Sequence, residues 1–364
     1  MTQTPANPTH PVAQPQGLSD WLAPDLTMGA ADYRGLIDAA LHFKRRYPRQ
    51  TESALHGRTV YFLFYNASLR TRSSFQTGLA RLGGHAVVLD PKHGIYTPAL
   101  PEAEIPYTTE RIEDVARVLS AYGDAIAIRM YGEPAGWVYG DAHRHLAAFA
   151  RAASVPVINM ECDRFHPCQA LADVMTMRER LGGLAGQRLC LSWAYSGSWH
   201  KPAAVPQSLL LAAVKSGMEV TLAHPPAFAL DTEVMQAATR FAAQTGGQVR
   251  VTHDFREGVA GAHAVYAKSW CSLAHLPKRR SDRVDEIGMR AEFDAHRDWC
   301  VDSDVMQLAA PGAGYLHCLP ADRGQEVTDE VIDGSQSWVF HQAANRLHAQ
   351  NAVMTHLLNP GCLI

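Results

Sequence analysis

The chain has 364 residues and a formal net charge of −3, from 33 Lys and Arg against 36 Asp and Glu. This balance gives no electrostatic basis for binding nucleic acid or an anionic membrane, and no apolar run is long enough to span a bilayer. The length predicts two domains, and a hydrophobic content of 47% is typical of a soluble enzyme. Residues 1–17 are rich in Pro, Thr and Gln, which predicts a disordered leader. The seven cysteines include no C-x-x-C pair, and no basic-then-apolar signal precedes them, which favours reduced thiols in the cytoplasm.

The first informative stretch joins a strand to a helix. Residues 59–65 are β-branched and aromatic, as in a buried strand, and apolar residues recur at helical spacing over 75–82. Ser68 is the expected N-cap, and Gly83-Gly84 the expected stop. Arg70 and Arg72 then fall in the first helical turn, where free N–H groups favour an anion. The stretch predicts a site for a dianion such as phosphate, unless these are solvated surface arginines.

Strand-like and helix-like segments alternate through the rest of the chain. The expected strands are 87–89, 125–128, 155–160, 189–193, 219–222, 249–252 and 264–266, and the expected helices are 112–122 and 171–181. In the helix 112–122, we expect Val115, Val118 and Leu119 to face inward. The alternation predicts parallel sheets covered by helices on both faces, with ligands beyond the carboxyl ends of strands.

Two further clusters carry donors and acceptors. Phe165-His166-Pro167-Cys168-Gln169 reads as a helix start, where His166 and Gln169 could both donate to a carbonyl oxygen. Tyr315 to Pro320 ends a strand before a proline, which leaves backbone carbonyls free to accept from a ligand NH₂. A lone histidine is more often a packed or capping residue. Arg129 and Lys268, at strand ends, and Arg346 would each be a solvated charge if seen alone.

Taken together, S-x-R-T-R, H-P-x-Q and H-C-L-P, in that order, resemble the aspartate/ornithine carbamoyltransferase superfamily over residues 55–355. The resemblance implies transfer of a carbamoyl group from carbamoyl phosphate to an amine, without a metal or organic cofactor. It implies the carbamoyl phosphate residues Ser68, Leu69, Arg70, Thr71, Arg72, Arg129, His166, Gln169, Cys318, Leu319 and Arg346. Of these, Arg129, His166, Gln169 and Cys318 would be catalytic, and Glu161, Lys268 and Cys318 would contact the acceptor.

The acceptor half departs from the ornithine enzymes. Tyr266-Ala267-Lys268-Ser269-Trp270 stands where they carry D-x-x-x-S-M-G. It resembles the knotted N-acetylornithine and N-succinylornithine enzymes, in which a lysine faces the substrate carboxylate. Residues 191–206 resemble their threaded proline-rich loop, whereas Ala321-Asp322-Arg323 matches a second knotted subgroup of unknown acceptor. The expected acceptor is the δ-amine of N-acetyl-L-ornithine, in arginine biosynthesis; ornithine, N-succinylornithine or another amine are alternatives.

The resemblance also implies an architecture. It predicts two Rossmann-like α/β domains: a carbamoyl phosphate domain at 18–170, an acceptor domain at 171–345, and a C-terminal helix, 346–364, that returns to the first domain. It predicts a homotrimer in which the 92–107 loop reaches a neighbouring site. That loop lacks the family's tryptophan, and Lys92 or Tyr96 could substitute.

Two other classes of protein are alternatives. A nucleotide-dependent enzyme would need a G-x-G-x-x-G turn, which the sequence lacks. A regulatory homologue without turnover would be favoured by a damaged donor site, and the donor motifs are intact.

Overall fold

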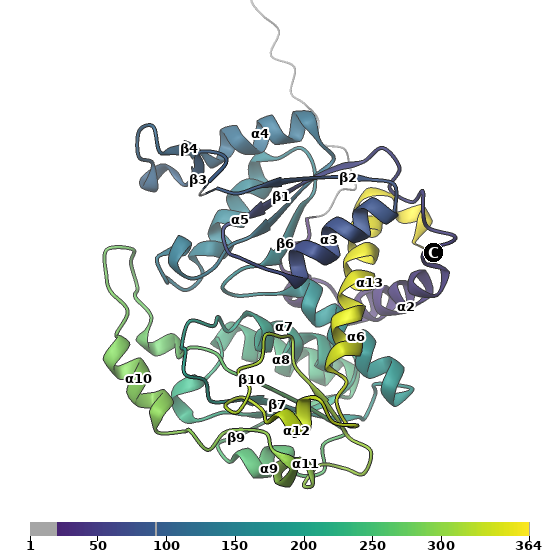
Figure 1. Cartoon of the computed structure of the whole chain (residues 1–364), viewed down its shortest axis with the longest axis vertical. Helices are drawn as coiled ribbons and strands as arrows, with labels where there is room; N and C mark the ends of the chain where they lie inside the picture. Colours follow the sequence, from purple (N-terminus) through teal and green to yellow (C-terminus); the bar gives the residue numbers. More distant parts are fainter. Residues whose placement is uncertain (1–19, 92, 364) are drawn as a thin grey trace, which may run out of the picture.

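The computed structural model describes residues 20–91 and 93–363 and contains two parallel sheets, one above the other in Figure 1. The predicted leader at 1–17 and Lys92 lie outside the described residues. Within the described part of the chain, no helix combines the length and the apolarity that a membrane span requires.

The first sheet has the strand order β2-β1-β5-β6, with every pair parallel. Its strands are β1 (Thr59–Phe64), β2 (His85–Leu89), β5 (Ala125–Arg129) and β6 (Val157–Glu161). Its helices are α3 (Arg70–Arg81), α4 (Ile112–Tyr122) and α5 (Asp141–Ala152), and a short parallel pair is formed by β3 (Thr97–Ala99) and β4 (Thr109–Arg111). Strands β2 and β5 flank β1 on opposite sides, so the carboxyl ends of β1 and β5 meet at a topological switch point.

The second sheet has the order β11-β10-β7-β8-β9 and is also entirely parallel. Its strands are β7 (Arg188–Trp193), β8 (Glu219–Ala223), β9 (Gln248–Thr252), β10 (Ala264–Lys268) and β11 (Gly314–Leu316). Its helices are α7 (Ala204–Lys215), α8 (Thr232–Thr245), α9 (Phe255–Val259), α10 (Glu286–Asp294), α11 (Ser303–Met306) and α12 (Asp329–Ile332). Here the switch point lies between β7 and β10.

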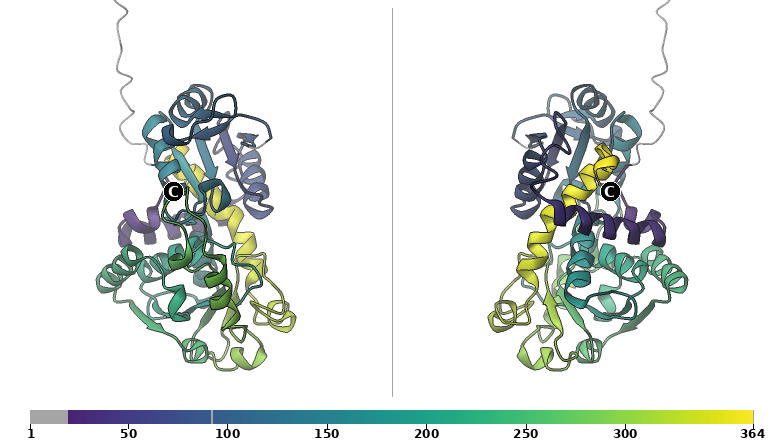
Figure 2. Two further views of the ribbon diagram at one scale, coloured as in Figure 1. Left: turned by 90° about the vertical axis from the view of Figure 1, so that its left-hand side faces the viewer. Right: turned by 90° about the vertical axis from the view of Figure 1, so that its right-hand side faces the viewer.

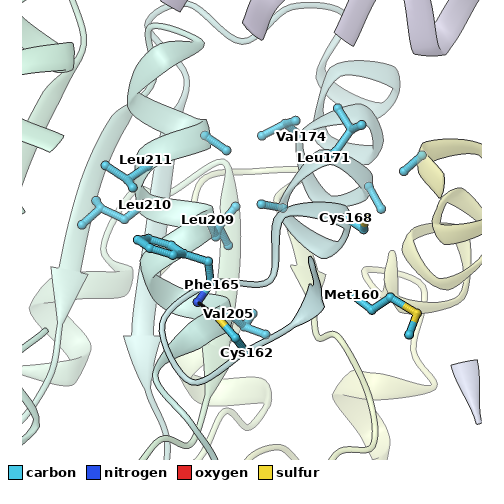
Figure 3. Packing of buried hydrophobic residues seen from close by; sticks show 14 of the residues in the cluster. Met160, Cys162, Phe165, Cys168, Leu171, Val174, Val205, Leu209, Leu210 and Leu211 are labelled. Carbon is cyan, nitrogen blue, oxygen red and sulfur yellow. Dashed lines mark hydrogen bonds between the residues drawn. The ribbon is translucent and has the colours of Figure 1, made fainter. Parts of the chain in front are cut away.

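Helices α6 (Pro167–Leu181) and α13 (Val339–Leu358) connect the two sheets. Helix α13 packs against α6 and α3 and crosses α2 (Ala30–Arg46), and Figure 2 shows it running from the second sheet up to the first. The short α1 (Pro24–Thr27) packs on α7. Helix α6 packs against α7, and Figure 3 shows Phe165, just before α6, beside Leu209 and Leu210 of α7. These contacts fix the two sheets with their strand ends toward one another.

The predicted α/β class with parallel sheets and covering helices is confirmed. The inward placement of Val118 is wrong: its side chain is 46% exposed, because α4 buries the stripe formed by Ile112, Val115, Ala116 and Leu119. The threading of the 191–206 loop stays a prediction.

Candidate active site

A cavity of about 540 Å³ lies where the strand ends of both sheets meet, within the range of about 300–1,000 Å³ usual for small-molecule sites. Its lining includes twelve of the predicted site residues: Ser68, Leu69, Arg70, Thr71, Arg129, Glu161, His166, Gln169, Lys268, Cys318, Leu319 and Arg346. Sheet register explains this convergence. Arg129 ends β5 beside Phe64 at the end of β1, and Lys268 ends β10 beside Trp193 at the end of β7. Both pairs stand at the switch points of their sheets.

The start of α3 forms one end of the cavity. The Ser68 hydroxyl accepts from the Thr71 N–H at 3.2 Å, as predicted for a cap. The Thr71 hydroxyl in turn accepts from Arg129 Nη1 at 3.4 Å and from Arg346 Nη2 at 3.1 Å. Among the described residues Arg70 makes no ion pair, and burial, with Arg129 nearby, lowers its pKa. Uncompensated cations around a helix N-terminus are suited to a dianion.

Arg72, predicted to join this group, does not line the cavity. It is exposed, and its guanidinium carbon lies 5.5 Å from the centre of the Phe64 ring. Helical geometry is the reason: residues two apart on a helix point about 200° apart, so Arg70 and Arg72 cannot face the same cavity.

The middle of the cavity gathers hydrogen-bond donors. Arg129 forms an ion pair with Glu161, and His166 Nε2 lies 3.5 Å from Glu161 Oε2. His166 is 3% exposed; burial, followed by the neighbouring arginines and Lys268, holds its pKa well below the usual value. A neutral imidazole at the head of α6 can donate a hydrogen bond without bringing another charge.

Gln169 is held in place by a chain of hydrogen bonds. Its side-chain oxygen accepts from Arg346 Nη1 at 2.5 Å, and its amide nitrogen donates to Asp173 Oδ1 at 2.6 Å. Gln342 of α13 donates to the same Asp173 oxygen at 2.6 Å. Burial raises the pKa of Asp173 to about 7. Helices α6 and α13 therefore fix the orientation of Gln169 jointly.

The other end of the cavity carries lysines from two loops of the second sheet. Lys268 Nζ donates to its neighbouring Ser269 carbonyl at 2.9 Å, and Lys201 Nζ lies 2.9 Å from Glu326 Oε2. Glu326 is fully buried, accepts from the Ser269 N–H at 2.7 Å and lies 3.4 Å from His317 Nε2. Burial opposes ionisation of Glu326, but His317 and the lysines more than offset it and hold its pKa well below the usual value.

Sequence reasoning missed several residues of this site. Tyr131, whose hydroxyl accepts from Arg129 Nη2 at 3.0 Å, His200 and Lys201 line the cavity. Lys201 lay within the proline-rich loop, and Tyr131 follows Arg129 by two residues, so weak signals existed. No comparable sequence signal pointed to Gln342 or Glu326. Within residues 20–91 and 93–363, no three His, Cys, Asp or Glu side chains are arranged to hold a metal ion.

Two family models match the chain. Residues 25–179 match the aspartate/ornithine carbamoyltransferase carbamoyl-P binding domain, and residues 192–357 match the Asp/Orn binding domain of the same family.

The similar relatives include an ornithine and an N-acetylornithine carbamoyltransferase. An ornithine carbamoyltransferase of Mycolicibacterium smegmatis is 42% identical over 301 residues, 83% of this chain and 86% of that protein. An N-acetylornithine carbamoyltransferase of Xylella fastidiosa is 37% identical over 348 residues, 93% of this chain and 96% of that protein.

Similar solved structures include an enzyme of each kind. A crystal structure of acetylornithine transcarbamylase complexed with acetylcitrulline superposes with a TM-score of 0.85 at 35% identity, over 94% of this chain and 100% of that one. Ornithine carbamoyltransferase from Pyrococcus furiosus gives a TM-score of 0.76 at 34% identity, over 94% of this chain and 97% of that one.

Proposed function

Because the chain belongs to the aspartate/ornithine carbamoyltransferase family and is a carbamoyltransferase, we propose that it carbamoylates the δ-amine of N-acetyl-L-ornithine, a step of arginine biosynthesis. The observation that carries the proposal is the charge of the cavity lining. The lining cations are Arg70, Arg129, Lys201, Lys268 and Arg346, of which Lys201 is paired outside the lining with Asp322 and Glu326. The carboxylate of the lining among the described residues is Glu161, which is paired with Arg129.

The donor end supports carbamoyl phosphate. Arg70, Thr71 and Arg346, with the free N–H groups of α3, offer a phosphate more donors than any neutral ligand would use. His166, Gln169 and Arg129 can donate to the carbamoyl oxygen, and the carbonyls of Cys318 and Leu319 are then available to its NH₂.

The reaction depends on how the protein positions the two substrates, and it requires no covalent bond between substrate and protein. The neutral amine attacks the carbamoyl carbon, a C–N bond forms, and the C–O bond to phosphate breaks, with the amine proton leaving on the phosphate. Negative charge develops on the carbamoyl oxygen, where His166 and Arg129 stabilise it. Burial keeps His166 neutral, so it acts as a hydrogen-bond donor and not as a proton source at neutral pH.

The acceptor end supports an acylated α-nitrogen. Lys268 and Lys201 suit the acceptor's carboxylate, whereas an α-ammonium group would meet these cations with no unpaired carboxylate among the described lining residues. Acylation removes that positive charge. Ornithine is the second candidate, and the 42% identical ornithine carbamoyltransferase of Mycolicibacterium smegmatis favours it. Ornithine would require Glu161 to serve both Arg129 and the α-ammonium group.

An acceptor panel tests the proposal. Initial rates are measured with carbamoyl phosphate and ornithine, N-acetylornithine, N-succinylornithine, putrescine or aspartate, and the highest kcat/KM is expected with N-acetylornithine. Lys268→Met keeps most of the apolar stem and is expected to raise the KM of the acceptor while leaving the KM of carbamoyl phosphate unchanged. Lys278→Met, on an exposed loop, is the matched control.

Other results would reject the proposal. A preference for ornithine would overturn the acylated acceptor, and turnover of none of the amines would favour a regulatory homologue. A Lys268→Met variant that loses carbamoyl phosphate binding would overturn the role of Lys268. A homotrimer in the cytoplasm is part of the same proposal, and sedimentation of the purified protein tests its assembly.

A further inference from the structure

Three aromatic rings lie beside the acceptor end of the cavity, and one of them, His200, belongs to its lining. Trp199 and His200 are stacked, with ring centres 3.9 Å apart and planes at 21°. Trp137 lies against both, 4.8 Å from Trp199 and 5.4 Å from His200 between ring centres. Trp137 follows β5 of the first sheet, whereas Trp199 and His200 follow β7 of the second. The aromatic trio of Trp137, Trp199 and His200 therefore bridges the two halves of the molecule.

The position of Trp137 is imposed by its backbone. Its φ of +58° is left-handed, a conformation that is unfavourable for residues other than Gly, Asn or Asp. Its indole lies against Gly132, where a Cβ would come within 3.1 Å of two ring atoms. Backbone strain of this kind persists where the surrounding structure enforces it, often at ligand sites. A ring held this way presents a fixed flat surface.

His200 connects the cavity to a second hollow. It lines the catalytic cavity, beside Lys201, and it also lines an outer hollow of about 590 Å³. Trp137 and Trp199 line this outer hollow as well, and the charged residues around them are Glu133, Arg280, Asp282, Arg283, Asp285 and Glu286. A ligand group that leaves the cavity past Lys201 therefore meets the His200 ring first, because Trp199 is 3% exposed and is stacked behind it.

We propose that the aromatic trio is the subsite for the acyl substituent on the acceptor's α-nitrogen, and that it takes planar acyl groups larger than acetyl, with an aroyl group as the best-suited class. The inference rests on the proposed function, because an ornithine with a free α-amine has no such substituent. The acyl nitrogen and the carboxylate leave the same α-carbon, so a carboxylate at Lys268 and Lys201 leaves the acyl group next to His200. Flat amide and aryl groups stack favourably on indole and imidazole faces. An acetyl group is too small to reach beyond His200.

The test compares N-benzoyl-L-ornithine with N-acetyl-L-ornithine. For the wild type we expect kcat/KM with the benzoyl acceptor to equal or exceed that with the acetyl acceptor. Trp137→Asn is the first variant, because Asn tolerates the left-handed backbone. His200→Ala is the second, because His200 is exposed and its loss does not depend on that backbone. Each variant is expected to lower kcat/KM for the benzoyl acceptor by about three- to tenfold more than it lowers kcat/KM for the acetyl acceptor.

Tyr122→Ala serves as the control, since it removes an aromatic ring that is 70% exposed on α4. A wild-type enzyme that uses the benzoyl acceptor at least tenfold less well than the acetyl one would overturn the subsite and leave the proposed function standing. The same holds if both variants reduce the two acceptors equally, which would make the trio a contact between domains only. Turnover of ornithine with neither acyl acceptor used would overturn the proposed function and the subsite together.

Discussion

Replacing Arg70 by alanine is expected to weaken carbamoyl phosphate binding without lowering the stability of the protein. The reason is that this guanidinium lies in the cavity without an ion pair among the described residues. If a phosphate dianion is its partner, the substitution removes one member of a desolvated, hydrogen-bonded charge pair. Such truncations cost about 2–5 kcal/mol, which corresponds to a loss of roughly 30-fold to several thousand-fold in kcat/KM for carbamoyl phosphate. The loss should be the same with every acceptor, since all share the donor.

The stability of the unliganded protein should not fall when Arg70 is replaced by alanine. Burial and the neighbouring Arg129 lower the pKa of Arg70, so the unliganded protein gains nothing from this charge. The Tm of unliganded Arg70→Ala is therefore expected to equal or exceed that of the wild type. Inorganic phosphate should raise the Tm of the wild type, because it binds only the folded state, and should raise that of Arg70→Ala much less.

Arg72→Ala is the matched control, two residues along the same helix. It removes an exposed guanidinium whose recorded contact is the Phe64 ring, worth about 0.5–1 kcal/mol of stability. Its activity and its response to phosphate should be unchanged. The reasoning would be refuted if Arg70→Ala kept more than about a tenth of the wild-type kcat/KM, a loss under about 1.4 kcal/mol, or if Arg72→Ala lost as much as Arg70→Ala.

Two further predictions follow from buried groups near the donor end. His166→Ala should lower kcat by about 10²–10³ through loss of one donor to the developing charge, while the midpoint of the acid limb of the pH–rate profile stays in place, because His166 is already neutral there; a shifted midpoint would contradict this. The pKa of Asp173 rises from 3.8 to about 7 on folding, so the folded state holds a proton that the unfolded state releases, and this group's contribution to stability falls as pH rises through that window. Asp173→Asn should therefore flatten the decline in unfolding free energy between about pH 4 and 7, measured by urea titration, and an unchanged slope would contradict the assignment.

The donor end could be predicted from the sequence because its parts are local. The strand, the cap and the first turn of α3 lie within 59–72, and the order of segments fixes where parallel strand ends meet. Two predictions were wrong because they placed a side chain on the wrong face of a helix. Arg72 and Val118 both lie on helices that were expected, but on faces that the spacing of their neighbours did not favour. Helical periodicity applied residue by residue would have excluded Arg72.

The polar supports of the site could not be predicted because they join residues far apart in the chain. Gln342 meets Asp173 across 169 positions, and Glu326 meets the Ser269 N–H across 57. Each partner alone resembles an ordinary helical or loop residue, and nothing in its local sequence shows that it is buried. Only the packing of α13 on α6, and of the loop after β11 on the loop after β10, brings the pairs together.

Because the donor end is local in sequence and the acceptor end is not, the sequence predicts the donor substrate better than the acceptor. The proposed donor end is a helix terminus, whose free N–H groups suit a phosphate whatever the surrounding loops contain. The proposed acceptor end is assembled from the end of β10 and from the loops after β7 and β11. Its charge is set by how Asp322 and Glu326 compensate Lys201 and Lys268. Under the proposed function, a single substitution that removes or adds an acidic residue there is expected to change which α-nitrogen the site tolerates. Under the proposed function, acceptor choice can therefore change while the donor end is kept, and the balance of charge in this chain is the argument for an acceptor without an α-ammonium group.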